Sequence, residues 1–237
     1  MTAKKSLSKL LTTAAIFAAF LGPVGVIAQD GAVVLKAVPV SEKFDPKAVY
    51  AAVWKNVPSH DIVLDTAPPV HDAVSGEAAI KRIKVQVARN EDGVLFRLQW
   101  KDKTADTRLR NLNTFIDGVA IQFAIDRDPA TSPIMGGEGK MVNIWYWNAR
   151  MNKGQNLIAN GFGTLAPLTT QDVTATGKYR TGTWTVVFHR RTKPAEAQAV
   201  NLDGTGKWPV SFAVWDGANQ ERDGLKAVTL AWQSLVL

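Results

Sequence analysis

The sequence of 237 residues predicts a mainly β fold, a single-domain antiparallel β-sandwich with a few short helices. One observation is a hairpin pattern: residues 80–100 contain two runs of alternating apolar and polar residues around the turn sequence NEDG at 90–93. A second is that alternating runs recur at short intervals, separated by turns rich in Gly, Asp and Pro. These runs predict strands at 117–125, 141–148, 183–190, 209–216 and 226–233.

Helical patterns, the third observation, are few. Residues 45–55 (DPKAVYAAVWK) start with a capping Asp and a Pro and carry apolar residues at helical spacing, so a short helix is expected there. Residues 194–200 could form another turn or two. Because no internal repeat or low-complexity linker divides the chain, we expect one domain.

The N-terminus has the pattern of a secretory signal peptide. Three lysines precede a mostly apolar run at 10–28, which ends in small residues at positions −3 and −1 relative to a cleavage after Ala28. A membrane anchor is the alternative, but Thr, Gly and Pro residues interrupt the run. We therefore expect residues 1–28 to be removed, leaving a domain at 29–237 in the periplasm with no membrane span.

Composition excludes several kinds of chemistry. Cysteine is absent, which rules out disulfides, thiol nucleophiles, iron–sulfur clusters, Cys-based zinc sites and covalently attached c-type haem. Without the three lysines of the signal segment, the formal net charge falls from +7 to +4. The remaining basic residues are spread along the strands rather than clustered, so no nucleic-acid partner is expected.

Templates for hydrolases and metal sites are also missing. The sequence has no Gly-x-Ser-x-Gly motif, and its three histidines, His60, His71 and His189, lack zinc-ligand spacing. We interpret them as surface or strand-end residues. The DRD sequence at 126–128 resembles part of a calcium loop, but it lacks the Gly and Glu that complete one, and a hairpin turn is expected.

Two features point to a bound group without identifying it. Eight Trp residues could fill the core, line a cofactor pocket or stack on sugars; Trp145 and Trp147 share one face of a predicted strand. Met135 lies between Pro133 and a Gly pair, a frame that suits a presented thioether ligand. Spacing alone leaves both packing and ligation open for Met135.

Three motifs together resemble a known family. They are FIDGVA at 115–120, MGxxGxxVNxWYW at 135–147 and FAVWDGxNxERxGxK at 212–226. In order and spacing, roughly residues 50–232 resemble the haem-b-binding γ subunits of periplasmic molybdenum enzymes of the dimethyl sulfoxide reductase type. That family includes the γ subunits of ethylbenzene dehydrogenase, dimethyl sulfide dehydrogenase, selenate reductase and chlorate reductase.

The resemblance implies one non-covalent haem b with Met and Lys as axial ligands. The Met corresponds to Met135, and the Lys is expected shortly before the FAVW strand, at Lys207. The inserted dipeptide WP at 208–209 lengthens that stretch, so Lys226 is the alternative and Lys193 a weaker one. An ammonium has no lone pair, so the ligand Lys must be buried enough to lose its proton.

By resemblance, the chain is an electron-transfer subunit and no catalyst on its own. It would relay electrons between the iron–sulfur β subunit and a soluble cytochrome c, while a molybdopterin-containing α subunit does the chemistry. We expect the complex to be a chlorate or selenate reductase. No molybdenum or iron–sulfur cluster is expected in this chain. The alternatives are a carbohydrate-binding sandwich without haem and a stand-alone monohaem cytochrome.

Overall fold

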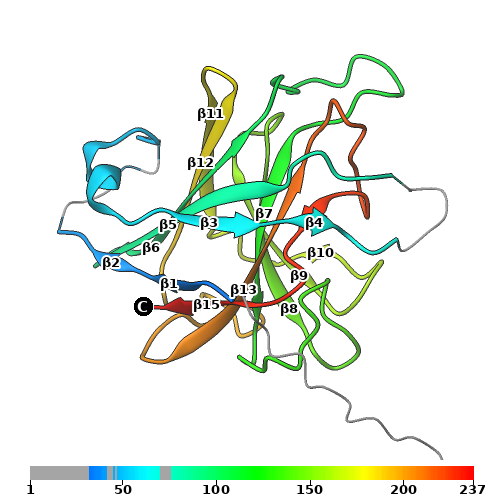
Figure 1. The fold of residues 1–237 in the computed structure, drawn as a ribbon. Helices are drawn as coiled ribbons and strands as arrows, with labels where there is room; N and C mark the ends of the chain where they lie inside the picture. Colours follow the sequence, from blue (N-terminus) through cyan, green and yellow to red (C-terminus); the bar gives the residue numbers. More distant parts are fainter. Residues whose placement is uncertain (1–31, 42–44, 46, 70–75) are drawn as a thin grey trace, which may run out of the picture. The chain divides into compact units, whose positions relative to one another are not determined.

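The alternating runs form two β-sheets whose apolar faces pack against each other (Figure 1). The computed structural model describes residues 32–41, 45, 47–69 and 76–237, all within the unit Gly31–Leu237. The predicted signal segment at 1–28 lies outside the described residues. In the part of the chain that is described, no helix is long and apolar enough to cross a bilayer.

The first sheet has nine strands and carries the site described below. Its main path runs β1-β15-β13-β7-β8-β9-β10, and only the β1–β15 pair is parallel. The short strands β14 and β4 attach beside β13. The strands are β1 (Val34–Lys36), β4 (Asp65–Thr66), β7 (Gly118–Ala124), β8 (Val142–Asn148), β9 (Gly154–Ala159), β10 (Ala166–Pro167), β13 (Lys207–Trp215), β14 (Ala227–Val228) and β15 (Gln233–Val236).

The second sheet has six strands in the order β11-β12-β6-β5-β2, with β3 paired to β5. Its central hairpin is β5 and β6, and β2 is parallel to β5. The strands are β2 (Val38–Pro39), β3 (His60–Val63), β5 (Arg82–Asn90), β6 (Gly93–Lys101), β11 (Thr174–Tyr179) and β12 (Thr183–Arg190). One 3-10 helix, η1 (Ala52–Asn56), packs Trp54 against this sheet.

The predicted sandwich and the hairpin at 80–100 are confirmed, with Asn90 facing Gly93 across the turn. The single strand predicted at 226–233 is wrong, because that stretch contains only β14 and the first residue of β15. Thr229 ends β14: its backbone N–H donates to Phe212 O and its hydroxyl accepts from Phe212 N–H. Of the helices expected, only Ala52–Asn56 is helical, and 194–200 forms turns and bends.

Aromatic side chains fill the space between the sheets. Trp145 contacts Phe123 and Phe96 at ring-centroid distances of 4.8 and 5.9 Å. Trp147 lies so close to the facing sheet that a Cβ at Gly177 would be 2.1 Å from its ring. Trp145 and Trp147 are therefore core residues, and a glycine is required where the second sheet meets the indole of Trp147.

Candidate functional site

The outward face of the nine-stranded sheet forms the floor of a cavity. Two rows of residues cross strands β13, β7, β8 and β9 in register on this face. The first row is Ala213, Ala120, Tyr146 and Gln155, and the second is Ser211, Gln122, Ile144 and Leu157. The floor is low over Ala213, Ser211 and Ala120 because their side chains are small. The large side chains of the same strands point into the core, since successive residues of a strand face opposite sides of the sheet.

Loops complete the cavity, which has a volume of about 760 Å³. The walls come from residues 109, 115–116, 133–135, 162–163, 165–167, 221–224 and 226. Most of the lining is apolar, with polar side chains at Glu221, Arg222 and Asp223 on one wall. This size and character are typical of pockets that enclose a large, mostly apolar ligand.

Met135 is held over this floor in an unusual backbone conformation. Its φ is 64°, in the left-handed region that residues with a side chain rarely adopt. The side chain of Gln122 holds the loop: its Oε1 accepts from Met135 N–H at 3.3 Å, and its Nε2 donates to Pro133 O at 2.8 Å. Met135 O also accepts from Gly161 N–H at 2.8 Å.

Gly136 allows the same turn. Its φ is 73°, and a Cβ there would lie 2.5 Å from the carbonyl oxygen of Lys140. The Met135 loop is thus held by two residues. The role of the glycine was expected from the sequence, whereas that of Gln122 was not. The available signal was a polar residue inside the otherwise apolar run VAIQFAI at 119–125.

Lys226 meets Met135 inside the cavity. Its Nζ lies 3.9 Å from Met135 Sδ and 5.0 Å from the centroid of the Trp215 ring. The side chain is buried, and this burial lowers the pKa of Lys226 to about 8, while the nearby Asp223 carboxylate acts in the opposite direction. An amine in this setting loses its proton far more readily than one in water.

Lys207 is not brought to Met135. It is exposed at the first position of β13, where it pairs with Val236, and it does not line the cavity. Lys207 precedes Ser211 by four residues, which is roughly 13 Å along a strand. Lys193, the weaker alternative, is also exposed and outside the cavity lining. Of the lysines considered, the geometry assembles Lys226 with Met135.

Charged groups on the wall are organised by hydrogen bonds. Glu221 accepts from Ala79 N–H at 2.7 Å and from Asp216 N–H at 3.1 Å, and burial raises the pKa of its carboxyl. The guanidinium of Arg222 lies 4.5 Å from the centroid of the Phe115 ring. These contacts place a cation and a buried carboxyl within one wall of the cavity.

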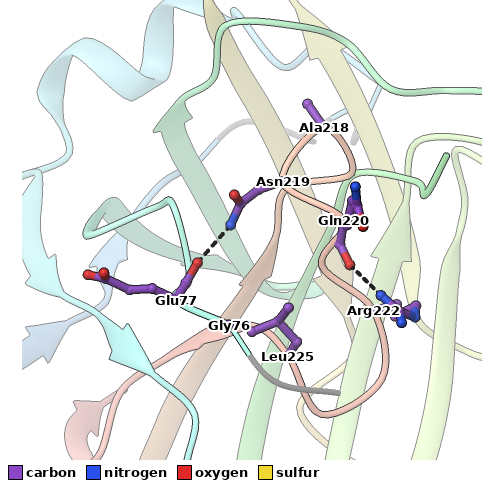
Figure 2. Close-up of a pocket in the computed structure, with 7 residues that line it drawn as sticks. All are labelled: Gly76, Glu77, Ala218, Asn219, Gln220, Arg222 and Leu225. Carbon is purple, nitrogen blue, oxygen red and sulfur yellow. Dashed lines mark hydrogen bonds between the residues drawn. The ribbon is translucent and has the colours of Figure 1, made fainter. Parts of the chain in front are cut away.

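A second, smaller cavity of about 260 Å³ lies behind that wall. Figure 2 shows its lining, in which Asn219 donates to the carbonyl oxygen of Glu77 and Arg222 to that of Gln220. Arg222 lines both cavities, and its neighbours on the loop line one or the other. The two hydrogen bonds to backbone oxygens hold this loop in place.

The other residues considered from the sequence lie elsewhere. His60 is on β3 and His189 on β12, where burial lowers the pKa of His189; His71 is outside the described residues. The DRD sequence forms a turn, with Arg127 at a φ of 59° and Asp128 paired with Lys140. Of the eight Trp, seven are buried and Trp215 is half-buried, so no exposed indole platform is available for sugars.

Comparison with known proteins identifies the family. The sequence model described as ethylbenzene dehydrogenase matches residues 51–167 and 163–227, most of the chain. The chain belongs to the ethylbenzene dehydrogenase family. The three motifs at 115–120, 135–147 and 212–226 fall within the matched segments, as do Met135 and Lys226.

Three relatives place the chain within this family. It is 41% identical to the chlorate reductase γ subunit of Ideonella dechloratans over 81% of this chain and 80% of that one. It is 36% identical to the dimethylsulfide dehydrogenase γ subunit of Rhodovulum sulfidophilum, over 76% and 71%. A candidate heme subunit of respiratory nitrate reductase from Haloferax mediterranei is 30% identical, over 78% and 66%.

Among solved structures, a candidate carbohydrate-binding protein from Bacteroides uniformis is similar in fold. Its TM-score is 0.50 at 10% identity, and the alignment covers 86% of this chain and 99% of that one. At this identity the similarity concerns the sandwich fold only.

Proposed function

We propose that this chain is the haem-carrying electron-transfer subunit of a periplasmic molybdoenzyme. One non-covalent haem b would occupy the cavity, with Met135 and Lys226 as its axial ligands. The observation that carries the proposal is the approach of Met135 Sδ and Lys226 Nζ to 3.9 Å within an apolar cavity of about 760 Å³. These residues are 91 positions apart in the chain, so the sandwich itself brings them together.

The residues fit such a group in polarity and donor type. Met135 Sδ and Lys226 Nζ, which are 3.9 Å apart, would hold the iron through one sulfur and one nitrogen donor. A thioether and a neutral amine are ligands that a low-polarity pocket can supply without burying charge.

Burial prepares Lys226 for this role. The pKa of about 8 means that removing the proton at neutral pH costs about 1.4 kcal/mol, at 1.36 kcal/mol per unit. For a fully solvated lysine side chain, whose reference pKa is about 10.4, the same step costs about 5 kcal/mol. A buried lysine is therefore the better ligand, and Lys226 is buried, whereas Lys207, the position expected from the motif spacing, is exposed.

When bound, a haem iron with two protein ligands supplies one-electron exchange without an open position for substrate. The residues of the chain then shape the cavity and hold the ligand loop in place. Gln122 holds the Met135 loop, Gly136 permits its turn, and the small residues Ala120 and Ala213 leave room for a flat ligand. Arg222 supplies a positive charge on the wall, which suits the acidic edge of a porphyrin.

The relatives support the assignment to a complex. Two are named γ subunits of chlorate reductase and dimethylsulfide dehydrogenase, and one a heme subunit of nitrate reductase. The proposed partners are a molybdopterin-containing α subunit, an iron–sulfur β subunit and a soluble cytochrome c. With 41% identity to the first relative, chlorate reduction is the favoured activity of the complex. Export to the periplasm after removal of residues 1–28 completes the proposal.

An absorption spectrum of the purified chain, with three matched variants, tests the proposal. The wild-type protein should show a low-spin b-type spectrum, with haem extractable by acid acetone. Met135→Ala and Lys226→Ala should each give a high-spin spectrum or lose the haem, while Lys207→Ala, the control at an exposed lysine, should leave it unchanged. A low-spin spectrum retained in Lys226→Ala and lost in Lys207→Ala would move the ligand to Lys207. A colourless wild-type protein would refute the haem assignment.

A further inference from the structure

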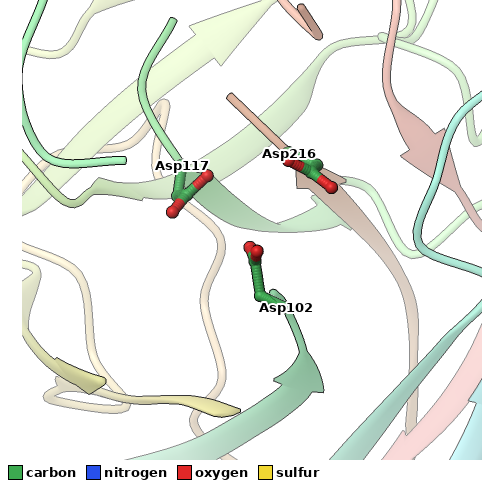
Figure 3. A group of neighbouring side chains, drawn as sticks. All are labelled: Asp102, Asp117 and Asp216. Atoms are coloured by element: carbon green, nitrogen blue, oxygen red, sulfur yellow. The ribbon is translucent and has the colours of Figure 1, made fainter. Parts of the chain in front are cut away.

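Three buried carboxylates gather where strands of both sheets end, outside the cavity lining. Asp102 follows β6, Asp117 precedes β7 and Asp216 follows β13 (Figure 3). One carboxylate oxygen from each lies within 4.8 Å of the others. Their exposed fractions are 5%, 0% and 9%, respectively. Three separate segments of the chain thus direct acidic groups into one small volume.

No counter-charge is visible among the described residues. None of their ion pairs involves Asp102, Asp117 or Asp216. Burial raises the pKa of Asp102 to about 6 and that of Asp117 to about 7. Nearby carboxylates raise these pKa values further: Asp216 and Asp106 act on Asp102, and Asp102 acts on Asp117. Burying unpaired like charges is costly, so a folded protein that keeps them needs a proton or a cation between them.

The hydrogen bonds show which oxygen is unsatisfied. Asp117 Oδ1 accepts from Gly217 N–H at 2.8 Å, and its Oδ2 accepts from Asp106 N–H at 2.7 Å and from the Trp184 indole at 2.9 Å. Asp216 Oδ1 accepts from the backbone N–H groups of 218 and 219 at 2.9 and 3.2 Å.

Asp102 differs from the other two. Its Oδ1 accepts from Thr104 N–H at 3.0 Å, but its Oδ2 is fully buried and has no hydrogen-bond partner. The nearby indole of Trp100 lowers the pKa of Asp102. The indole nitrogen of Trp100 is nevertheless buried without a hydrogen-bond partner of normal geometry. A buried carboxylate oxygen left unpaired within an acidic cluster points to a ligand that supplies positive charge.

We propose that Asp102, Asp117 and Asp216 bind a divalent cation, Ca²⁺. The cluster offers only oxygen donors, which suit hard cations. Calcium accepts oxygen ligands in flexible geometry, whereas Mg²⁺ demands a near-ideal octahedron and gives up its waters reluctantly, so three carboxylates fixed by their own hydrogen bonds favour calcium. Oxygens within 4.8 Å of one another fit the span of two Ca²⁺–oxygen bonds of about 2.3–2.6 Å.

The ion would join the segments that build the cavity. Asp117 follows Phe115 and Ile116, and Asp216 follows Trp215, all of which line the cavity. The Asp216 N–H also donates to Glu221 on the wall. A cation here would fix these segments from behind, whether or not the cavity holds haem, so the two proposals can fail independently.

Terbium luminescence tests the site directly, because Tb³⁺ binds calcium sites and is excited by nearby Trp. The Trp184 indole is hydrogen-bonded to Asp117, so Tb³⁺ added to the chelator-treated full chain should emit on Trp excitation, and Ca²⁺ should displace it. Calcium at about 100 times Kd should raise the melting temperature by about 5–10 °C. Mg²⁺ at the same concentration should raise it less.

Asp102→Asn is the matched variant, because the amide keeps the Thr104 hydrogen bond and removes the charge. It should reduce Tb³⁺ and Ca²⁺ affinity at least 10-fold, whereas Asp128→Asn, at a half-buried carboxylate paired with Lys140, should leave both unchanged. Near-UV circular dichroism verifies that each variant is folded. The proposal is overturned if wild-type protein shows no saturable emission and no calcium-dependent melting shift. Equal affinities in wild type and Asp102→Asn would overturn it as well.

Discussion

The two faces of strands β7, β8 and β13 differ in volume although they arise from one alternating pattern. Inward positions hold large side chains such as Phe123, Trp145 and Phe212, all buried between the sheets. Outward positions on β7 and β13 hold Ala120 and Ala213, and a cavity lies over them. The same strands therefore form a close-packed core on one side and the floor of a cavity on the other.

The difference shows how a sandwich can gain a site at little cost to its stability. A core position loses both burial and packing when it is truncated, because surrounding atoms cannot close the gap. An outward position beside the cavity lacks packed atoms on its cavity side, so a change there leaves a smaller gap in the packing. Residues of the same strands that point inward should therefore matter more for stability than those that border the cavity.

The largest contrast is expected between two tryptophans, Trp145 and Trp215. Trp145→Ala should lower the free energy of unfolding by about 3–5 kcal/mol, because the side chain is completely buried against Phe123. Trp215→Ala, on the outward face and half-buried, should cost about 1 kcal/mol in the ligand-free protein. Urea unfolding of both variants measures the difference, and equal losses would contradict the distinction between the faces.

A polar residue on the outward face should have an intermediate effect. Gln122→Ala removes the donors to Pro133 O and Ser211 Oγ and should cost about 1–3 kcal/mol. It should also release the Met135 loop and shift the bound haem toward high spin. Gln198→Ala, at an exposed glutamine outside the cavity lining, is the control and should change neither unfolding nor spectrum.

The carboxylate cluster of Asp102, Asp117 and Asp216 is a third region, and it should differ from both faces of the sheet in the pH dependence of its contribution to stability. In calcium-free protein, the raised pKa values of Asp102 and Asp117 mean that the folded state keeps protons that the unfolded state releases. Their contribution to stability is therefore lost as pH rises from about 4 to about 7.

Asp102→Asn isolates that contribution. After allowance for solvent screening, the loss from pH 4 to pH 7 should be smaller in the variant by on the order of 1 kcal/mol. Urea unfolding at both pH values in the presence of a chelator provides the measurement. Parallel pH profiles for wild type and variant would show that Asp102 does not hold a proton in the folded state.

Filling the cavity should have the smallest effect on folding. Ala213→Leu adds volume to the floor without displacing core atoms, so its unfolding free energy should stay within about 0.5 kcal/mol of wild type. Haem affinity should nevertheless fall at least 10-fold, because the added side chain occupies ligand space. Ala213→Ser, which adds a single atom, should bind haem normally in the same titration.

Local patterns predicted the elements that are bounded by strong turns. The hairpin of β5 and β6, the strands near 117–125, 141–148 and 183–190, and the sandwich class all follow from period-two alternation. Strands β9 and β11 were missed because GQNLIA and TATGKY lack a clear alternation. Their pairing depends on neighbours, since β9 lies beside β8 and β11 beside β12.

For the candidate site, the sequence by itself pointed to Met135 and its glycine turn and contained the family motifs. Only the tertiary structure decided that Lys226, rather than Lys207, meets that sulfur, that Gln122 holds the loop, and that three distant aspartates converge. The physical reason is the distance along the chain between the residues that meet. Alternation and turn chemistry act over a few residues, whereas these contacts depend on β13 lying beside β7 and on loops folding across the sheet, which no local pattern encodes.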